Sequence, residues 1–211
     1  NPMNSWDKSD SGFGCGNDDE YFCENCPSSF HCTSQKTTYN IGPNDLKLMK
    51  NLCKAGSDHR KFMRMITVYV DITAPLYWWK EFDTYKVDTV ANSCSTMHKI
   101  ANKKFTLEDF SCEHLETAWL TNLKETIKIL NWARDAYRLC DEGVKKEWWW
   151  QMIQLLPSSY NQRRTVMLNY EVLANIYKSR NNHKLDEWLE FCKWIENLPY
   201  SELITGEKHD A

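Results

Sequence analysis

Apolar residues recur along this chain with two different periods, and each period predicts a different kind of element. From residue 66 to residue 73, β-branched residues occupy every second position, which predicts a strand with one buried face that ends at Ala74-Pro75. The apolar residues before this strand are spaced as on a helix, which we expect to begin at Pro43 and end before Gly56. The aromatic stretch Leu76–Tyr85 is also expected to be helical.

Helical spacing dominates the second half of the chain. Thr106 and Asp109 resemble a capping box, so we expect a long helix to follow and to end near Gly143. Residues 86–96 are mostly small and polar, which predicts a loop lying close to another part of the structure. The expected apolar stripe of the long helix comprises Leu115, Trp119, Leu123, Ile127 and Leu130. Three further helices are expected at Glu147–Leu156, Arg164–Arg180 and Leu185–Asn197. Many helices with at least one good strand predict the α+β class.

Composition narrows the class of protein. A formal net charge of −3 over 211 residues gives no basic footprint for duplex DNA or RNA. The apolar runs are far too short to span a bilayer, so no membrane partner is expected. The chain begins at Asn1 without a signal-peptide pattern, and we expect a residue or strand upstream of it. Five cysteines are scattered singly through patterned segments, which favours small buried hydrophobes in a reducing, cytoplasmic environment over a disulfide scaffold.

The expected helix Arg164–Arg180 carries the most informative residues. On a helical wheel, Asn169 and Arg180 fall within its apolar arc, although burying an amide or a guanidinium without partners costs several kcal/mol, roughly. One interpretation is structural, with an Arg–carboxylate pair and an Asn that caps a neighbouring segment. The other is functional, because the fixed donors of Arg180 suit a carbonyl, carboxylate or phosphate on a ligand.

The stretch LLPSSYNQRRTVMLNYEVLANIYKSRNNHKLDEW resembles the C-terminal region of flavin-dependent thymidylate synthases. In that family a Leu-Pro pair precedes a helix bearing an Asn, a second Asn six residues later and an Arg five residues after that. These positions are Asn169, Asn175 and Arg180 here, without gaps. The resemblance implies that both Asn side chains contact the flavin and that Arg180 contacts the uracil ring of dUMP.

The resemblance extends upstream, where the family signature is eroded. His59 falls on a family His when counted back from Pro75. The family's R-H-R triplet reads Thr84-Tyr85-Lys86 here, and its N-x-x-S motif is restored at Asn92 and Ser95 with one inserted residue. The Arg after that motif is Met97, and Glu171 replaces an Arg that the family uses on the flavin. Lost Arg residues weaken the binding of anionic ligands unless other groups replace them, and the candidates are Lys80, Lys86, Arg163, Arg164 and Ser95.

The resemblance implies a divergent family member of viral or mobile-element type that methylates dUMP to dTMP. FAD would be its cofactor, and NADPH and methylenetetrahydrofolate its co-substrates. Arg180 would be the catalytic residue; Ser95, Arg180 and Lys86 would bind substrate; His59, Lys86, Asn92, Asn169 and Asn175 would bind FAD. The implied fold is a helix-rich single domain around a small, mainly antiparallel sheet, as in thymidylate synthase-complementing proteins. The implied assembly is a homotetramer whose sites lie between subunits.

The N-terminal residues 1–41 are expected to form an irregular, Cys-rich segment, followed by the synthase-like domain at 42–211. Cys15, Cys23, Cys26 and Cys32 lie close enough in sequence to bind a structural zinc ion, although their spacing is irregular for a zinc ribbon. Two alternatives to dTMP synthesis stay open. The scaffold could carry out altered pyrimidine-nucleotide chemistry, or it could be a non-catalytic nucleotide-binding, nucleic-acid-binding or interaction protein with a zinc-stapled loop.

Overall fold

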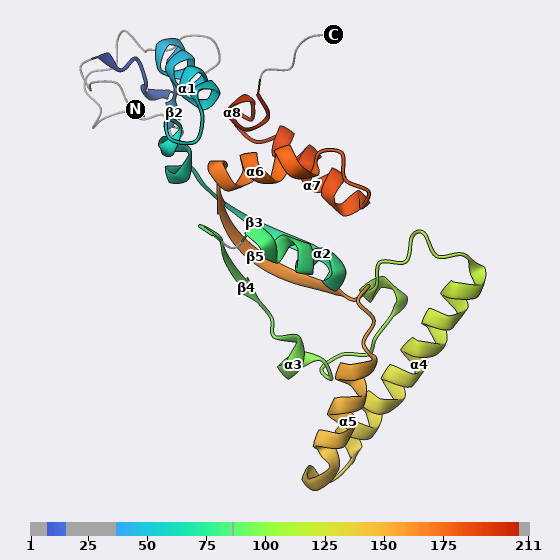
Figure 1. The fold of residues 1–211 in the computed structure, drawn as a ribbon. Helices are drawn as coiled ribbons and strands as arrows, with labels where there is room; N and C mark the ends of the chain where they lie inside the picture. Colours follow the sequence, from blue (N-terminus) through green and yellow to red (C-terminus); the bar gives the residue numbers. More distant parts are fainter. Residues whose placement is uncertain (1–7, 16–36, 86, 207–211) are drawn as a thin grey trace.

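The computed structural model describes residues 8–15, 37–85 and 87–206, which form a helix-rich α+β fold (Figure 1). The strands are β1 (Gly12–Cys15), β2 (Thr37–Asn40), β3 (Thr67–Pro75), β4 (Val90–Ser93) and β5 (Asn161–Asn169). The α-helices are α1 (Pro43–Ala55), α2 (Leu76–Phe82), α3 (Thr96–Lys99), α4 (Thr117–Leu139), α5 (Glu142–Leu155), α6 (Tyr170–Arg180), α7 (Asp186–Glu196) and α8 (Glu202–Thr205). Short 3-10 helices occur at Lys61–Met65, Asp83–Tyr85 and Leu107–Asp109.

A three-stranded sheet of order β3-β5-β4 lies at the centre, and both of its strand pairs are antiparallel. α2 lies over this sheet in Figure 1. The strand predicted from period-two alternation is confirmed, because Val68, Val70 and Ile72 pack against the main core while Tyr69 is 71% exposed. The small antiparallel sheet in a helix-rich fold confirms the predicted fold class.

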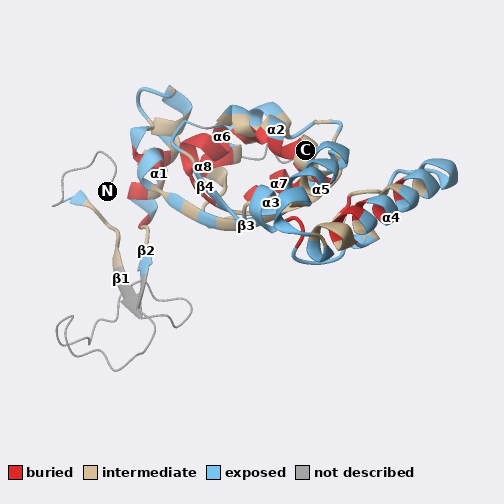
Figure 2. Cartoon of the chain, turned by 90° about the horizontal axis from the view of Figure 1, so that it is seen from below, coloured by how far each residue is buried: buried red, intermediate tan, exposed pale blue. Residues whose placement is uncertain are grey.

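The main hydrophobic core joins the sheet to α2, α6 and α7. Trp78 of α2 lies at its centre, with a ring-centroid distance of 4.6 Å to Trp188 of α7. Its other buried members include Met63, Val166, Leu168, Leu173, Ile176 and Ile195. Buried residues are concentrated in α6, as Figure 2 shows, so this helix is held firmly on its apolar side. The predicted helices at 43–55, 76–85 and 185–197 are confirmed.

The hairpin of α4 and α5 forms a second core and extends away from the sheet (Figure 1). The predicted start of the long helix, directly after Thr106, was wrong. The capping box begins only a 3-10 turn, and α4 begins at Thr117. Leu115 precedes α4 and is 39% exposed, and Trp119 in the first turn of α4 is 66% exposed, while the rest of the predicted stripe is buried. The predicted end was also misplaced. Extended backbone at Cys140 ends α4, and Gly143 lies inside α5.

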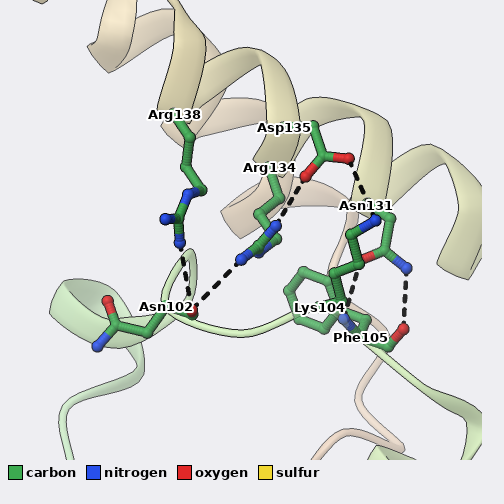
Figure 3. Close-up of polar contacts among 7 residues, drawn as sticks. All are labelled: Asn102, Lys104, Phe105, Asn131, Arg134, Asp135 and Arg138. Atoms are coloured by element: carbon green, nitrogen blue, oxygen red, sulfur yellow. Dashed lines mark hydrogen bonds and ion pairs between the residues drawn. The ribbon is translucent and has the colours of Figure 1, made fainter.

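A polar network ties residues 102–105, a segment that contributes Phe105 to the second core, to α4 (Figure 3). The Asn131 amide donates to the Phe105 carbonyl at 2.8 Å and accepts from the Phe105 N–H at 2.9 Å. The buried Arg134 donates to the Asn102 carbonyl at 3.3 Å and pairs with Asp135 at 2.7 Å. These side chains replace the backbone partners that an irregular segment lacks, and they fix its path across the hairpin.

The loop predicted at 86–96 is partly a strand. Val90–Ser93 forms β4, and its residues pair with β5 from Val90 opposite Met167 to Ser93 opposite Arg164. All four residues are exposed, so neither composition nor burial marks them as a strand, and pairing with the neighbouring strand decides the conformation. Within the described ranges, no helix is long and apolar enough to cross a membrane.

Candidate functional site along α6

The segment predicted as one helix from Arg164 to Arg180 is a strand followed by a helix. β5 continues to Asn169, and α6 begins at Tyr170. Val166 and Leu168 are fully buried at alternate positions, which is the period of a strand. Because β5 pairs with β3 on one side and β4 on the other, tertiary hydrogen bonds override a sequence that also fits helical spacing.

Because the helix begins only at Tyr170, Asn169 is the N-cap of α6 and not an interior residue. Its Oδ1 accepts a hydrogen bond from the Val172 N–H at 3.0 Å, and the residue is 4% exposed. Such a cap contributes about 1 kcal/mol to stability. Asn169 and Arg180 therefore lie at opposite ends of α6, about 16 Å apart along its axis.

Arg180, the last residue of α6, is held by three neighbours. Its Nε donates to the Tyr85 hydroxyl at 3.0 Å, and its Nη1 lies 3.1 Å from Oε2 of Glu81. The same Glu81 oxygen accepts a hydrogen bond from the indole N–H of Trp188 at 2.9 Å, and the Arg180 guanidinium lies 4.9 Å from the centroid of the Trp188 ring. The structure thus contains the Arg–carboxylate pair of the structural interpretation, whereas Asn169 caps α6 itself and not a neighbouring segment. Arg180 Nη2 makes no hydrogen bond to any described residue.

Two hollows, together called the groove below and each called a lobe, lie beside α6, and Arg60, Asn175 and Lys178 line both of them. One lobe, of about 610 Å³, is also lined by Gly56, Ser57, Arg64, Val87, Asp88, Glu171 and Val172. The other, of about 430 Å³, is also lined by Lys50, Cys53, Lys54, Ala174, Tyr177, Asn181 and Glu202–Gly206. Basic side chains outnumber acidic ones in the two linings, although the whole chain carries a formal charge of −3. The groove therefore favours an anionic ligand.

Arg60 is held in the groove by Glu171, which is 7% exposed in the first turn of α6. Arg60 Nη2 donates to Oε1 of Glu171 at 2.9 Å, and Arg60 Nε lies 2.8 Å from Oε2. The carboxylate thus faces one edge of the guanidinium. Sequence reasoning missed Arg60, although it directly follows His59, which was singled out.

The thiol that lines the groove, Cys53, stays protonated because it is partly buried. Burial raises the pKa of Cys53 to about 11; Arg60 lowers this pKa and Glu171 raises it. Burial likewise raises the pKa of Cys192 to about 11. Both thiols behave as the small hydrophobes predicted from sequence, whereas Cys94 is exposed, contrary to that expectation, because it follows the exposed strand β4.

The other predicted site residues do not all gather at α6. His59 is exposed in the turn between α1 and the next 3-10 helix, where its N–H donates to the Gly56 carbonyl at 3.0 Å. Asn92 lies opposite Thr165 on β5, about 13 Å along the strand from Asn169. Ser95 lies farther still, at the N-terminus of α3. Lys86 is outside the described residues.

Two of the side chains considered as replacements for lost Arg residues, Arg163 and Arg164, have other partners. Arg164 lies 4.2 Å above the Trp79 ring and 3.3 Å from Asp83, and Arg163 pairs with Asp71. Trp78 and Trp79 are each 1% exposed and pack in the core, so neither ring is accessible for stacking on a ligand.

The predicted zinc ligands are only partly described. Cys15 ends β1, while Cys23, Cys26 and Cys32 lie outside the described residues. Among the residues that the structure does describe, no group of three or more potential metal ligands occurs. Zinc binding by the cysteines stays a prediction from sequence.

Comparison with known proteins finds similarity in structure but not in sequence. No protein-family model matches the chain, and no curated protein matches it in sequence. Two solved structures of the flavin-dependent thymidylate synthase ThyX from Helicobacter pylori, each with FAD and dUMP, match with a TM-score of 0.55. Both are 16% identical to this chain, and each match covers 79% of this chain and 83% of theirs. The chain therefore shares the fold of ThyX, which defines its structural class.

Proposed function

We propose that this chain is a divergent flavin-dependent thymidylate synthase that binds FAD and methylates dUMP. The observation that carries this proposal is the groove beside α6, where Arg60, Asn175 and Lys178 line a hollow suited to an anionic nucleotide. The fold shared with ThyX supports the same assignment. NADPH and methylenetetrahydrofolate are the proposed co-substrates, and dTMP the proposed product.

The residues at the ends of α6 have defined proposed roles. Arg180 would use its Nη2 to polarise a uracil carbonyl, because Nε and Nη1 already face Tyr85 and Glu81. Asn169 would use its Nδ2 toward the flavin, since its Oδ1 caps the helix. Asn175 is exposed within the groove and would contact the flavin or its phosphates. Bound FAD would supply hydride chemistry, while the protein would position and polarise the nucleotide.

Asn92 and Ser95, the remaining proposed ligand contacts, lie away from α6 in the same chain. We therefore propose that they complete the site of another subunit in a homotetramer, in which His59 and Lys86 also contact FAD. An apolar hollow of about 1060 Å³ supports an interface, because it includes the exposed Met65 and Tyr69. Exposed apolar surface of this kind is typical of subunit contacts.

Flavin and nucleotide binding test the proposal directly. Purified protein should be yellow or become yellow with added FAD, and dUMP should bind to the flavin-loaded form. Arg180→Ala should weaken dUMP binding about tenfold or more, because a charge-assisted hydrogen bond is lost. The matched control is Lys124→Ala, which removes an exposed cation on α4 and should leave dUMP affinity unchanged. Colourless protein that also fails to take up FAD would overturn the proposal.

Glu81 and Tyr85 already pair with two of the three nitrogens of the Arg180 guanidinium. This observation favours a specific alternative, a non-catalytic binding protein. Product analysis with dUMP, methylenetetrahydrofolate and NADPH separates the possibilities. Formation of dTMP supports synthesis, another modified pyrimidine supports altered chemistry, and binding without turnover supports the non-catalytic protein. For the proposed zinc staple, metal content should fall to background in the double variant Cys23→Ser and Cys26→Ser.

A further inference from the structure

The pair of Arg60 and Glu171 has an asymmetric geometry. Glu171 Oε1 and Oε2 face Nη2 and Nε of Arg60, at 2.9 and 2.8 Å. A guanidinium presents two edges that can each hold an oxyanion, one formed by Nε and Nη2 and the other by Nη1 and Nη2. Only the first edge is used by Glu171. No described residue forms a hydrogen bond with Nη1 of Arg60.

The burial of the pair indicates which partner positions the other. The Glu171 side chain is 9% exposed and that of Arg60 is 22% exposed, so the carboxylate lies beneath the guanidinium. The backbone of Arg60 is also fixed, because its N–H donates to the Gly56 carbonyl at 3.2 Å. Arg60 is therefore held from both its backbone and its inner edge, with little side-chain entropy left to lose when a ligand binds.

The position of Arg60 indicates what it would bind. Both lobes of the groove are lined by Arg60, Lys178 and Asn175, so a ligand in either lobe lies beside these three residues. Two cations and an amide donor at that point suit a phosphoryl or diphosphoryl group, whose oxygens accept from a guanidinium edge and from an ammonium. Ligands with a diphosphate between two organic groups have this arrangement of charge.

We propose that Arg60, positioned by Glu171, is the phosphate-binding residue of the groove and takes a diphosphoryl group on its Nη1–Nη2 edge. The inference rests on the proposed function, since it concerns the same groove, and it adds an anion-binding residue from outside α6. It also gives the acidic residue at position 171 a role. Where the family has an Arg, Glu171 instead positions the guanidinium of Arg60, which comes from another segment, in the groove.

Inorganic pyrophosphate is the probe that tests this assignment without any flavin or dUMP. Isothermal titration calorimetry should show binding that weakens as salt rises, since charged contacts to phosphate are screened. Arg60→Gln should lower pyrophosphate affinity about tenfold or more, and Arg60→Lys should lower it less, because the charge stays but the two-donor edge is lost. Lys124→Gln, on α4, is the matched control and should bind as the unchanged protein does.

A second variant distinguishes a loss of binding from misfolding. In the double variant Arg60→Met and Glu171→Met, no uncompensated charge is left buried, so the protein should keep a cooperative thermal transition. We expect this variant to lose pyrophosphate affinity about tenfold as well. Unchanged affinity in the folded double variant, or no binding by the unchanged protein at millimolar pyrophosphate, overturns the inference. Arg60-dependent binding of pyrophosphate by a protein that ignores FAD and dUMP would instead support the inference and overturn the proposed function.

Discussion

The two ends of α6 each hold an arginine against a carboxylate, but they differ in what the arginine is free to do. At the N-terminal end, Arg60 comes from another segment, and Glu171 occupies one edge of its guanidinium. At the C-terminal end, Arg180 belongs to the helix and contacts Glu81, Tyr85 and the Trp188 ring. The same chemical pair thus leaves a donor edge facing the groove at one end and a largely satisfied cation at the other.

The helix itself favours this arrangement of charges. A carboxylate in the first turn and a cation in the last turn both complement the helix dipole, and Glu171 and Arg180 occupy these positions. The carboxylates of the two ion pairs differ in exposure, however. The Glu171 side chain is 9% exposed and that of Glu81 is 37% exposed, so losing the carboxylate should destabilise the N-terminal end more than the C-terminal end. The following predictions test that difference.

Removing each carboxylate should give the largest contrast. Glu171→Ala leaves Arg60 part-buried without its partner and should lower the free energy of unfolding by about 3 kcal/mol. Glu81→Ala should cost less, about 2 kcal/mol: its carboxylate is more exposed and Arg180 keeps Tyr85 and the Trp188 ring, but the buried Trp188 N–H loses its acceptor. Urea denaturation of both variants measures the difference. Equal losses would show that the two ends are energetically alike.

Thiol reactivity reports on burial at the N-terminal end. Cys53 lines the groove with a pKa raised from 9.0 to about 11, which lowers its thiolate fraction at pH 8 about a hundredfold. The exposed Cys94 should therefore react with iodoacetamide far faster than Cys53, as measured by mass spectrometry of the alkylated peptides. Because the folded pKa of Cys53 exceeds its unfolded value, this thiol favours the folded state below pH 9. That contribution should be lost as pH rises toward 11. Equal alkylation rates would contradict the partly buried position of Cys53.

The cap of α6 should have a moderate effect. Asn169→Ala removes the acceptor for the Val172 N–H and should lower the free energy of unfolding by about 1 kcal/mol. Asn175→Ala is the matched control, because Asn175 is exposed inside the helix and Ala has the higher helix propensity. The control should unfold at the same or a slightly higher urea concentration. A loss in the control as large as that in Asn169→Ala would contradict the capping role.

The smallest effect is expected at the C-terminal end. Tyr85→Phe removes the hydroxyl that accepts from Arg180 Nε but keeps the ring, so stability should fall by only about 0.5 kcal/mol. The shift in thermal midpoint measures this change. A loss as large as that of Glu171→Ala would show that Tyr85, rather than Glu81 or Trp188, holds Arg180.

Several features follow from the sequence alone, because they depend on neighbouring residues. Alternating β-branched residues determine β3, and the bounds of α1 are set by Pro43 and Gly56. The helical class, the small antiparallel sheet and the likeness to ThyX in fold were predicted correctly. The need of Asn169 and Arg180 for partners was also predicted from sequence, since polar groups among apolar neighbours require hydrogen bonds or ion pairs.

Only the tertiary structure decided how those residues are used. β5 became a strand because β3 and β4 offer hydrogen bonds on both of its sides, and that pairing made Asn169 a cap. The contact of Arg60 with Glu171 joins residues far apart in sequence, so no local pattern encodes it. Local spacing determines which residues need partners, whereas the packing of distant segments determines which partners they receive.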